Sequence, residues 1–303
     1  MTALDGAIDA YCAQLTDVRG LSENTERGYE TDLRAFSRWC DARGVDALSI
    51  THKELRAYLG YLSRARYTTT TINRHLSAIR GLYSWMGAHG YETSEAAAAV
   101  ASPKNARRLP ATMSDDDAAR LLDSCNPSVP EGLRDRAFLE LLYASGARVS
   151  EVSDLDVDAI DFGSSQLRLI GKGDKERLVP VYESALDWVG RYLHEARGSF
   201  LAKAKKDPVD SARAVFLSTR GNRMSADALR RVFESHVASC GLDSSLTPHA
   251  MRHTYATELL SGGADLRSVQ ELLGHESLST TQIYTHLSVD RLKDAARAAH
   301  PRT

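Results

Sequence analysis

One stretch, Thr247–His286, constrains the chain more than any other, because it gathers residue types that handle phosphate. Thr247 is a suitable helix N-cap, and Pro248 suits the first helical position. His249 and Arg252 follow, and their spacing of three residues places both side chains on one helix face. Backbone N–H groups and the helix dipole favour an anion at a helix N-terminus. The start of this helix is therefore a candidate anion site.

The rest of the stretch predicts two further helices. One is expected over Asp265–Leu273 and ends at Gly274, which suits the left-handed position after a helix and is followed by His275. A short third helix is expected from about Ser279 and carries Tyr284. Arginine binds phosphate oxygens with two hydrogen bonds, histidine moves protons, and tyrosine can act as a covalent nucleophile. This combination suits a phosphodiester substrate.

Length and composition are those of a globular protein with two domains. The chain has 303 residues, of which 43% are hydrophobic and 26% are charged. No apolar run approaches the roughly 20 residues that span a membrane, and the N-terminus lacks the basic start of a signal peptide. We therefore expect a cytoplasmic protein without membrane contact. The cysteines are scattered and form no CxxC pair, which argues against a zinc site or a disulfide framework: Cys12, Cys40, Cys125 and Cys240.

Net charge alone does not indicate nucleic-acid binding. The formal net charge is -2 and the pI is about 6.6, whereas a DNA-binding domain usually has a pI above ~9. Binding to DNA would require the acidic runs at 115–117 and 154–161 to lie away from it. Between Arg64 and Arg108, basic residues far outnumber acidic ones, which suits phosphate contact, although a solvated helix face is the plainer interpretation.

The first third of the chain predicts a bundle of helices. Apolar residues at helical spacing indicate four helices. They are expected over 1–20, from a cap at 22–25 to about Arg43, from Ser49 or Thr51 through Leu62, and over 72–90 with a cap at Thr69–Thr71. The alanine-rich segment 94–101 can add a short fifth helix. The basic, proline-bounded segment 102–110 has no periodicity and indicates a linker. We expect a helical DNA-binding domain at 1–104, a linker at 105–111 and a second domain at 112–303.

The second part of the chain predicts helices around a small β-hairpin. Two alternating apolar runs, Gln166–Ile170 and Arg177–Val181, flank a glycine-rich turn that contains Lys172. Helices are expected after a cap at Ser114, over Leu133–Tyr143 as an amphipathic helix that breaks at Ser145 and Gly146, after a cap at Ser150, and over 186–197 and 226–240. An exposed connection is expected at 198–213 and a short strand at 215–218.

Four motifs follow one another along the chain. They are SGARVSE with Arg148, GKGDKER with Lys172, PHAMRHTYAT with His249 and Arg252, and LLGHESLSTTQIYTH with His275 and Tyr284. With these motifs, essentially the whole chain resembles the tyrosine recombinases of the integrase family, and within them the Xer site-specific recombinases. The terminal AAHPR is more similar to the XerC branch than to the XerD branch. The family often has a larger aliphatic residue in place of Ala147 and Phe in place of Tyr255.

The resemblance implies catalytic roles for six residues, where single residues would have plainer interpretations. Arg148 and Arg252 would bind the scissile phosphate rather than serve as surface arginines. Lys172 would protonate the 5′ leaving oxygen rather than only make a hairpin tip soluble. His249 would accept the tyrosine proton or bind the phosphate. His275 would donate a hydrogen bond to the phosphate rather than only cap a helix.

Tyr284 is the expected nucleophile, although a tyrosine in an amphipathic helix is more often a core residue. Tyr255 is the competing candidate, but it forms a stripe with Leu259 and Leu260 that is typical of a core face. By resemblance, Tyr284 attacks the phosphate, forms a 3′-phosphotyrosyl bond and frees a 5′-hydroxyl. Because the covalent link keeps the bond energy, we expect neither ATP nor a metal nor another cofactor. Two arginines would replace the charge of a metal.

The resemblance also implies a fold and partners. The fold class is mainly α with two domains: an all-α, SAM-like core-binding domain and an α+β catalytic domain with a small β-hairpin or sheet. The domains would clamp a double-stranded DNA recombination site, and four protomers would act on two duplexes. The C-terminal tail would dock on a neighbouring protomer. The XerC-like tail implies a heterotetramer with a XerD-like recombinase that resolves chromosome dimers for partition at cell division, under a DNA translocase.

Three other functions remain open at the level of the sequence. An integrase of a phage or mobile element would have the same site and differ in DNA target and partner; we expect no extra arm-binding domain, which favours the Xer type. A non-catalytic DNA-binding protein on the same fold would be expected to lack one of the six residues, and all six are present. A metal-dependent nuclease has no ligand motif here to support it.

Overall fold

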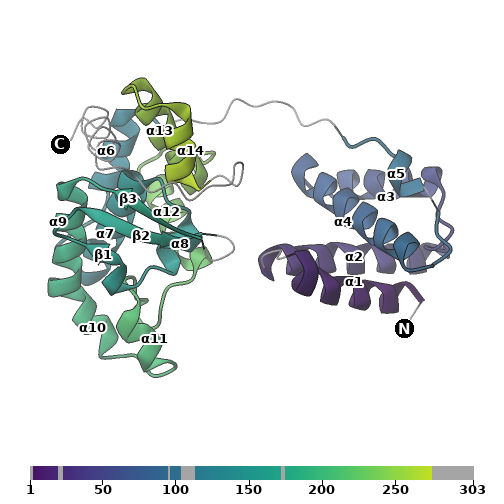
Figure 1. The fold of residues 1–303 in the computed structure, drawn as a ribbon, viewed down its shortest axis with the longest axis horizontal. Helices are drawn as coiled ribbons and strands as arrows, with labels where there is room; N and C mark the ends of the chain where they lie inside the picture. The colour runs from purple at the N-terminus through teal and green to yellow at the C-terminus, as the bar shows by residue number, and fades with distance from the viewer. Residues whose placement is uncertain (1–2, 20–22, 95, 104–112, 172–174, 275–303) are drawn as a thin grey trace. The chain divides into compact units, whose positions relative to one another are not determined.

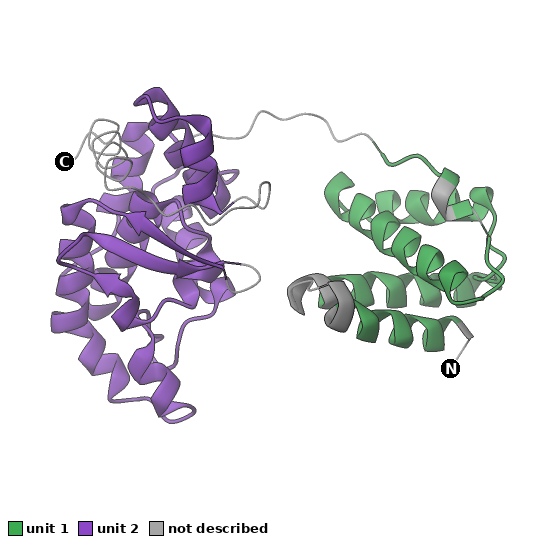
Figure 2. Ribbon diagram, in the orientation of Figure 1, with its two compact units in different colours: residues 1–107 green, residues 108–303 purple. Residues whose placement is uncertain are grey.

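The structure is a computed structural model that describes the 303-residue chain except for residues 1–2, 20–22, 95, 104–112, 172–174 and 275–303. The chain divides into two compact units, Met1–Arg107 and Arg108–Thr303 (Figure 2). The predicted linker at 105–111 lies outside the described residues, so the domain limits 1–104 and 112–303 remain a prediction. Among the described residues, no helix has the length and apolar character needed to cross a membrane.

The described part of the first unit is helical. Its helices are α1 (Ala3–Arg19), α2 (Glu23–Arg43), α3 (His52–Arg64), α4 (Thr69–Ala88) and α5 (Ala96–Ala99) (Figure 1). Helix α4 packs against α1, α2 and α3, and the rings of Tyr11, Phe36 and Tyr58 are buried in one core. The predicted bundle of four helices with a short fifth is therefore confirmed.

Side-chain caps set where α3 and α4 begin. The Glu54 N–H donates to Thr51 Oγ1 at 3.3 Å, and the Thr51 N–H donates to Glu54 Oε2 at 2.8 Å, which is a reciprocal capping box. This confirms the expected start at Thr51. Helix α4 begins earlier than expected, because Thr68 Oγ1 accepts the Thr71 N–H at 3.2 Å. The threonines at 69–71 therefore form the first turn rather than the cap.

A buried carboxylate organises the polar part of this core. Asp32 accepts hydrogen bonds from Arg74 Nε at 2.8 Å and Nη2 at 3.0 Å, and it lies 3.2 Å from His75 Nε2. Burial lowers the pKa of His75 in spite of this carboxylate. His75 Nδ1 pairs with the Tyr58 hydroxyl at 3.0 Å. Part of the basic character expected at 64–108 is thus neutralised within the unit, because Arg74 is paired with Asp32.

The second unit combines helices with one small sheet. Its helices are α6 (Asp115–Asp123), α7 (Pro130–Ser145), α8 (Val149–Ser153), α9 (Glu183–Arg191), α10 (Arg197–Leu201), α11 (Pro208–Arg213), α12 (Ala226–Ser239), α13 (Pro248–Ser261) and α14 (Leu266–Leu273). A 3₁₀ turn, η1 (Val157–Ala159), and a π-helical turn, η2 (Tyr192–Ala196), are also present. The helix expected at 186–197 corresponds to α9, η2 and the start of α10. The predicted fold class, mainly α with an α+β second domain, is confirmed.

The sheet has three antiparallel strands in the order β1 (Ile160–Asp161), β2 (Gln166–Ile170) and β3 (Glu176–Pro180) (Figure 1). Leu169 pairs with Arg177 in the β2–β3 register. The Gly171 N–H donates to the Lys175 carbonyl at 2.8 Å where the hairpin loop begins. The predicted hairpin is confirmed, but β3 begins one residue earlier and the short strand β1 is added.

Helix α7 is buried on all sides rather than along one stripe. It packs against α6, α9, α13 and η2, and even Arg134, Arg136 and Glu140 are buried. Arg136 Nε donates to Glu140 Oε1 at 2.8 Å, and Arg136 Nη1 donates to Asp123 at 3.0 Å. The expected amphipathic pattern is therefore wrong for α7, because mutual pairing lets its charged side chains enter the core.

Two expectations between residues 198 and 218 need correction. The segment 198–213 is largely exposed, as expected, but it is not a plain connection, because it contains most of α10 and all of α11. The strand expected at 215–218 makes one isolated bridge, between Leu217 and Arg223. Its backbone bonds to other elements instead: the Leu217 N–H donates to the Tyr192 hydroxyl at 3.2 Å.

Candidate active site

The chain reaches the first candidate residue, Arg148, through a left-handed turn. Helix α7 ends at Gly146, whose φ is 56°, and Arg148 takes the N-cap position of α8. The Glu151 carboxylate accepts hydrogen bonds from the Arg148 backbone N–H at 2.7 Å and from Arg148 Nη1 at 2.9 Å. The expectation that Ser150 caps this helix is wrong: Ser150 lies inside α8, and Glu151 supplies the oxygen at its start.

Helix α13 begins as predicted and carries two further candidates. Thr247 is the N-cap, with its hydroxyl accepting a backbone N–H of the first turn at 3.3 Å, and Pro248 occupies the first turn. Arg252 is 5% exposed and donates from Nη1 to the Gly146 carbonyl at 2.7 Å. His249, one turn earlier, is exposed. The two candidates share a helix but differ in environment.

Three guanidinium groups converge on the C-terminal end of α14. The helix begins after its N-cap Asp265, one residue later than expected, and it ends at Gly274 with a φ of 64°, as predicted. Its last carbonyls accept hydrogen bonds from Arg177 Nε (Leu272, 2.7 Å), Arg252 Nη2 (Leu273) and Arg148 Nη2 (Gly274, 3.1 Å). The last carbonyls of an α-helix have no partner within the helix, and the helix dipole favours positive charge at this end. Arg148 and Arg252, distant in sequence, thus meet at one place.

Glu151 partly compensates this concentration of positive charge. Arg177 donates two hydrogen bonds to the Glu151 carboxylate, from Nη1 to Oε1 at 2.8 Å and from Nη2 to Oε2 at 2.7 Å. Burial acts to raise the pKa of Glu151, but the hydrogen bonds from Arg177 and from the Arg148 backbone outweigh it and lower the pKa below its ordinary value. Glu151 is therefore a carboxylate at neutral pH. Together with Arg252, the cluster has three positive charges and one negative charge.

Arg252 is the arginine of the cluster whose protonation is most affected by its neighbours. Burial, and next the charge of Arg148, lower the pKa of Arg252 to about 10. Arg252 still carries its proton at neutral pH and repels Arg148. A bound anion would relieve that repulsion, and the Arg148 side chain, which is 43% exposed, is open to one. The arrangement therefore suits a phosphate group.

Two residues of this cluster, Glu151 and Arg177, are not among the candidates that the sequence predicts. Both stand inside the motifs that carry Arg148 and Lys172. A glutamate three residues after a helix start is a recognisable capping signal, so Glu151 had a local signature. The bond from Arg177 to Leu272 joins residues distant in sequence and has none.

Comparison with known families decides what kind of site this is. The model of the phage integrase family matches residues 111–291, and that of the N-terminal SAM-like domain of phage integrases matches residues 8–90. The chain belongs to the phage integrase family, the tyrosine recombinases. It is therefore an enzyme that cuts and rejoins DNA through a tyrosine intermediate.

The recombinase is similar to curated Xer proteins of both kinds. It is 40% identical to the tyrosine recombinase XerC of Myxococcus xanthus, over 100% of both chains. It is 39% identical to the tyrosine recombinase XerD of Shewanella oneidensis, over 98% of this chain and 97% of that one. The expected resemblance to the Xer site-specific recombinases is confirmed. Because the two identities are nearly equal, overall identity does not separate the two kinds.

A solved integrase has the same fold as the recombinase. A lambda integrase dimer bound to a COC′ core site aligns with a TM-score of 0.66 at 21% identity, over 93% of this chain and 99% of that chain. This likeness confirms the two-domain fold.

The described part of the recombinase contains three of the predicted catalytic residues. It brings Arg148 and Arg252 together and places His249 on the helix of Arg252. The other three, Lys172, His275 and Tyr284, lie outside the described residues, and their roles remain predictions. Among the residues that the structure describes, no three His, Cys, Asp or Glu side chains are grouped so as to hold a metal ion.

Tyr255, the competing nucleophile, is a core residue of the recombinase. Its side chain is 1% exposed and packs with Leu259 in the small core of α13 and α14. The expected core stripe fits Tyr255 and Leu259, but Leu260 is 40% exposed and does not belong to it. A phenol buried in this way is poorly placed to attack a DNA phosphate.

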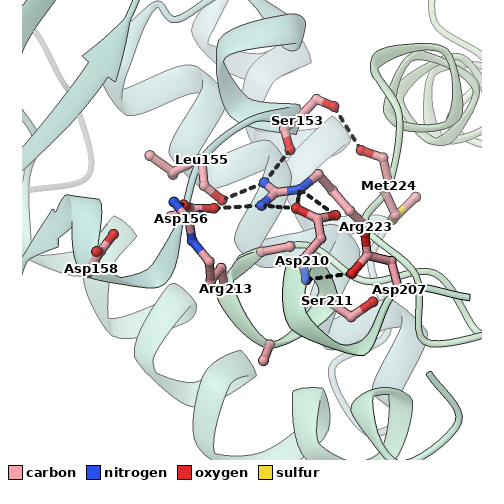
Figure 3. Close-up of polar contacts among 12 residues, drawn as sticks. Ser153, Leu155, Asp156, Asp158, Asp207, Asp210, Ser211, Arg213, Arg223 and Met224 are labelled. Atoms are coloured by element: carbon pink, nitrogen blue, oxygen red, sulfur yellow. Dashed lines mark hydrogen bonds and ion pairs between the residues drawn. The ribbon is translucent and has the colours of Figure 1, made fainter. Parts of the chain in front are cut away.

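A network of charged residues anchors the end of α8, the helix that carries Glu151 (Figure 3). Arg223 donates from Nη2 to Asp156 at 2.6 Å, from Nε to Asp210 at 2.8 Å and from Nη1 to the Ser153 carbonyl at 3.2 Å. Ser153 is the last residue of α8. The network therefore fixes one end of the helix whose other end holds the candidate phosphate site.

Proposed function

We propose that the recombinase cleaves DNA with Tyr284 as its nucleophile. The Tyr284 oxygen bonds to the scissile phosphorus, the bond to the 5′ oxygen breaks, and a 3′-phosphotyrosyl link and a 5′-hydroxyl result. A 5′-hydroxyl from a partner duplex then attacks the link, releases the tyrosine and restores a phosphodiester. Because the covalent link conserves the bond energy, rejoining requires no ATP.

In this proposal the other five residues move protons and stabilise charge. His249 accepts the tyrosine proton, and Lys172 protonates the leaving 5′ oxygen. Arg148 and Arg252 bind the non-bridging oxygens, and His275 adds a hydrogen bond to the phosphate. The two arginines supply the positive charge that metal ions supply in other phosphodiester-cleaving enzymes. The proposal therefore includes no metal and no other cofactor.

The observation that carries the proposal is the meeting of Arg148 and Arg252 at the end of α14. They donate to the neighbouring carbonyls of Gly274 and Leu273, and both are fixed by further protein oxygens, Arg148 by Glu151 and Arg252 by Gly146. Donors held in place in this way stabilise developing charge without reorganising during the reaction. Paired guanidinium groups of this kind suit the two non-bridging oxygens of a phosphodiester.

We further propose that the recombinase resolves chromosome dimers together with a XerD-like partner. The full-length similarity to both XerC and XerD proteins supports an Xer recombinase, and the XerC-like AAHPR tail supports the XerC side of such a pair. The two proteins would form a heterotetramer on two copies of a double-stranded DNA recombination site in the cytoplasm, under the control of a DNA translocase. Segment 288–303 would dock on a neighbouring protomer.

A strand-exchange assay tests this proposal. Two labelled duplexes with a chromosomal dimer-resolution site are incubated with the recombinase, with and without the XerD-like partner. We expect Holliday junctions and recombinant duplexes only when both proteins are present. Exchange that needs no partner, or that occurs only on the attachment site of a mobile element, would contradict dimer resolution and favour an integrase of a phage or mobile element.

Deleting residues 288–303 tests the docking role of the tail. The shortened chain should unfold at nearly the same temperature as the full chain but form fewer tetramers and recombine more slowly. An unchanged recombination rate would count against docking of this segment.

A further inference from the structure

Arg177 is held inside the cluster at the end of α14. Its side chain is 9% exposed, against 43% for that of Arg148. Each of its three side-chain nitrogens donates to a protein oxygen: Nε to the Leu272 carbonyl, and Nη1 and Nη2 to the Glu151 carboxylate. Arg177 is therefore engaged inside the protein, and any effect on a bound phosphate passes through its neighbours.

The Glu151 carboxylate is shared unequally between two arginine side chains. Arg177 binds both of its oxygens, at 2.8 and 2.7 Å. The Arg148 side chain donates to only one of them, from Nη1 to Oε1 at 2.9 Å, and its Nη2 donates to the Gly274 carbonyl at 3.1 Å. The Glu151 side chain is 4% exposed, so its charge requires a close positive partner. Arg177 is the arginine that binds the Glu151 carboxylate in a bidentate manner.

Loss of the Arg177 charge would strengthen the ion pair between Arg148 and Glu151. The buried Glu151 carboxylate would draw its compensation from Arg148, the other guanidinium that it contacts. Arg148 would then be fully paired with Glu151, and the cluster would lack the positive charge of Arg177. A guanidinium that faces a carboxylate at contact distance attracts a phosphate more weakly, because the two negative charges repel each other.

Arg177 also joins elements that adjoin two predicted catalytic residues in the chain. It lies on β3, which follows the loop that contains Lys172, and it bonds to the last turn of α14, which His275 follows after one residue. Its bonds to Glu151 connect the same strand to α8. A single side chain thus ties β3, α8 and α14 together.

We propose that Arg177 is a positioning residue of the recombination site, which neutralises Glu151 so that Arg148 stays available to the scissile phosphate. The proposal rests on the proposed role of Arg148 as a phosphate ligand. It predicts an effect on the rate of strand cleavage rather than on DNA affinity, because duplex binding is spread over many phosphate contacts.

Single-turnover cleavage of a nicked duplex by the full-length chain tests the proposal. Arg177→Met removes the charge and keeps an unbranched side chain. We expect it to slow formation of the covalent complex by roughly 10- to 100-fold, while the Kd for the duplex changes by less than about threefold. Arg168→Met on β2 is the matched control, since Arg168 is 43% exposed and pairs with Glu176 at 3.4 Å. Its rate should equal that of the unaltered enzyme.

A second substitution separates charge neutralisation from support of the fold. The double variant Arg177→Met/Glu151→Gln also lacks the carboxylate charge that would capture Arg148. We expect the double variant to cleave about tenfold faster than Arg177→Met. If Arg177 only supported the fold, the double variant would cleave more slowly than Arg177→Met, because Glu151→Gln would add its own loss of activity.

Arg177→Lys covers the case in which Arg177→Met does not fold. It keeps the positive charge beside Glu151 but cannot make the bidentate contact. Its rate of cleavage should therefore lie between those of Arg177→Met and the unaltered enzyme. An unaltered rate for Arg177→Met, or for Arg177→Lys where only that variant folds, would overturn the proposal. So would a double variant slower than Arg177→Met. If the unaltered enzyme itself formed no covalent product on any recombination site, the proposed function would fail, and this proposal with it.

Discussion

The ring of Tyr255 fills the space that a side chain at position 146 would need. A Cβ built on Gly146 would lie 2.3 Å from a ring carbon of Tyr255. The Gly146 carbonyl also accepts the hydrogen bond from Arg252 Nη1 at 2.7 Å. Gly146 therefore connects the candidate phosphate site with the core beneath it, and it does so in a left-handed conformation with a φ of 56°.

Replacing this glycine is expected to destabilise the protein strongly. Gly146→Ala combines the cost of a left-handed alanine, about 1 kcal/mol, with overpacking against Tyr255, about 1–3 kcal/mol. Urea unfolding measures the sum. Gly241→Ala is the matched control, because Gly241 has a φ of 62° and no atom within 4 Å of its Cβ position. Equal losses from the two variants would contradict the close packing on Tyr255.

Arg252→Lys should retain DNA binding and lose most of the cleavage rate. A lysine keeps the charge, but its ammonium cannot reproduce the planar contacts with the carbonyls of Gly146 and Leu273. We expect the single-turnover rate to fall by about 100-fold or more. Arg267→Lys on α14 is the control, since Arg267 is 63% exposed and pairs with Glu271 at the surface. An unaltered rate for Arg252→Lys would argue against its place in the site.

In the network at the end of α8, we expect substitutions of two arginines that contact the same aspartate to lower the free energy of unfolding by unequal amounts. Arg223 and Arg213 both pair with Asp156, but the Arg223 side chain is 18% exposed and that of Arg213 is 67% exposed. Arg223→Met should cost about 2–4 kcal/mol, and Arg213→Met less than about 1 kcal/mol. Chemical denaturation gives both values. Two equally small losses would show that the network does not anchor α8.

Glu258 on α13 predicts a pH-dependent stability. Burial, and next the charge of Asp115, raise the pKa of Glu258 to about 7, even though the Tyr143 hydroxyl donates to it at 3.4 Å. Since the folded pKa lies above the ordinary value of about 4.5, the folded state holds this proton more tightly than the unfolded chain. The resulting stabilisation is complete below the unfolded pKa and is lost as the pH rises through the folded pKa.

The matching variant is Glu258→Gln, which cannot ionise. It should raise the free energy of unfolding by about 1–3 kcal/mol at pH 8 and by clearly less at pH 5. Urea unfolding at the two pH values measures the difference. A gain of the same size at both would mean that ionisation of Glu258 is not its cause.

Features that depend on neighbours in sequence could be predicted. Thr51 and Thr247 start helices through bonds to the first turn that follows them, and Gly274 ends α14 by its own conformational freedom. Such interactions leave a local pattern of polar, proline and glycine residues. Local periodicity also predicts the helical bundle and the hairpin, whereas the SAM-like and catalytic domain types and the catalytic roles of the six candidate residues depend on a resemblance carried by motifs.

Features that depend on distant residues could not be predicted. The Leu217 N–H donates to the side-chain hydroxyl of Tyr192, a residue distant in sequence, rather than to a neighbouring strand. Burial of charged residues of α7 depends on partners such as Asp123. The same holds in the site, where Arg177 meets Leu272 only after β3 and α14 have packed. Spacing in the sequence carries no information on contacts of this kind.

The central claim is that Tyr284, and not the buried Tyr255, forms the covalent link. The most direct measurement is a covalent-trap assay, in which a nicked duplex with a recombination site is incubated in EDTA and run on a denaturing gel. We predict a shifted protein–DNA band for the unaltered enzyme and for Tyr255→Phe, and none for Tyr284→Phe, although that variant still binds the duplex. A full yield of covalent complex from Tyr284→Phe would contradict the claim.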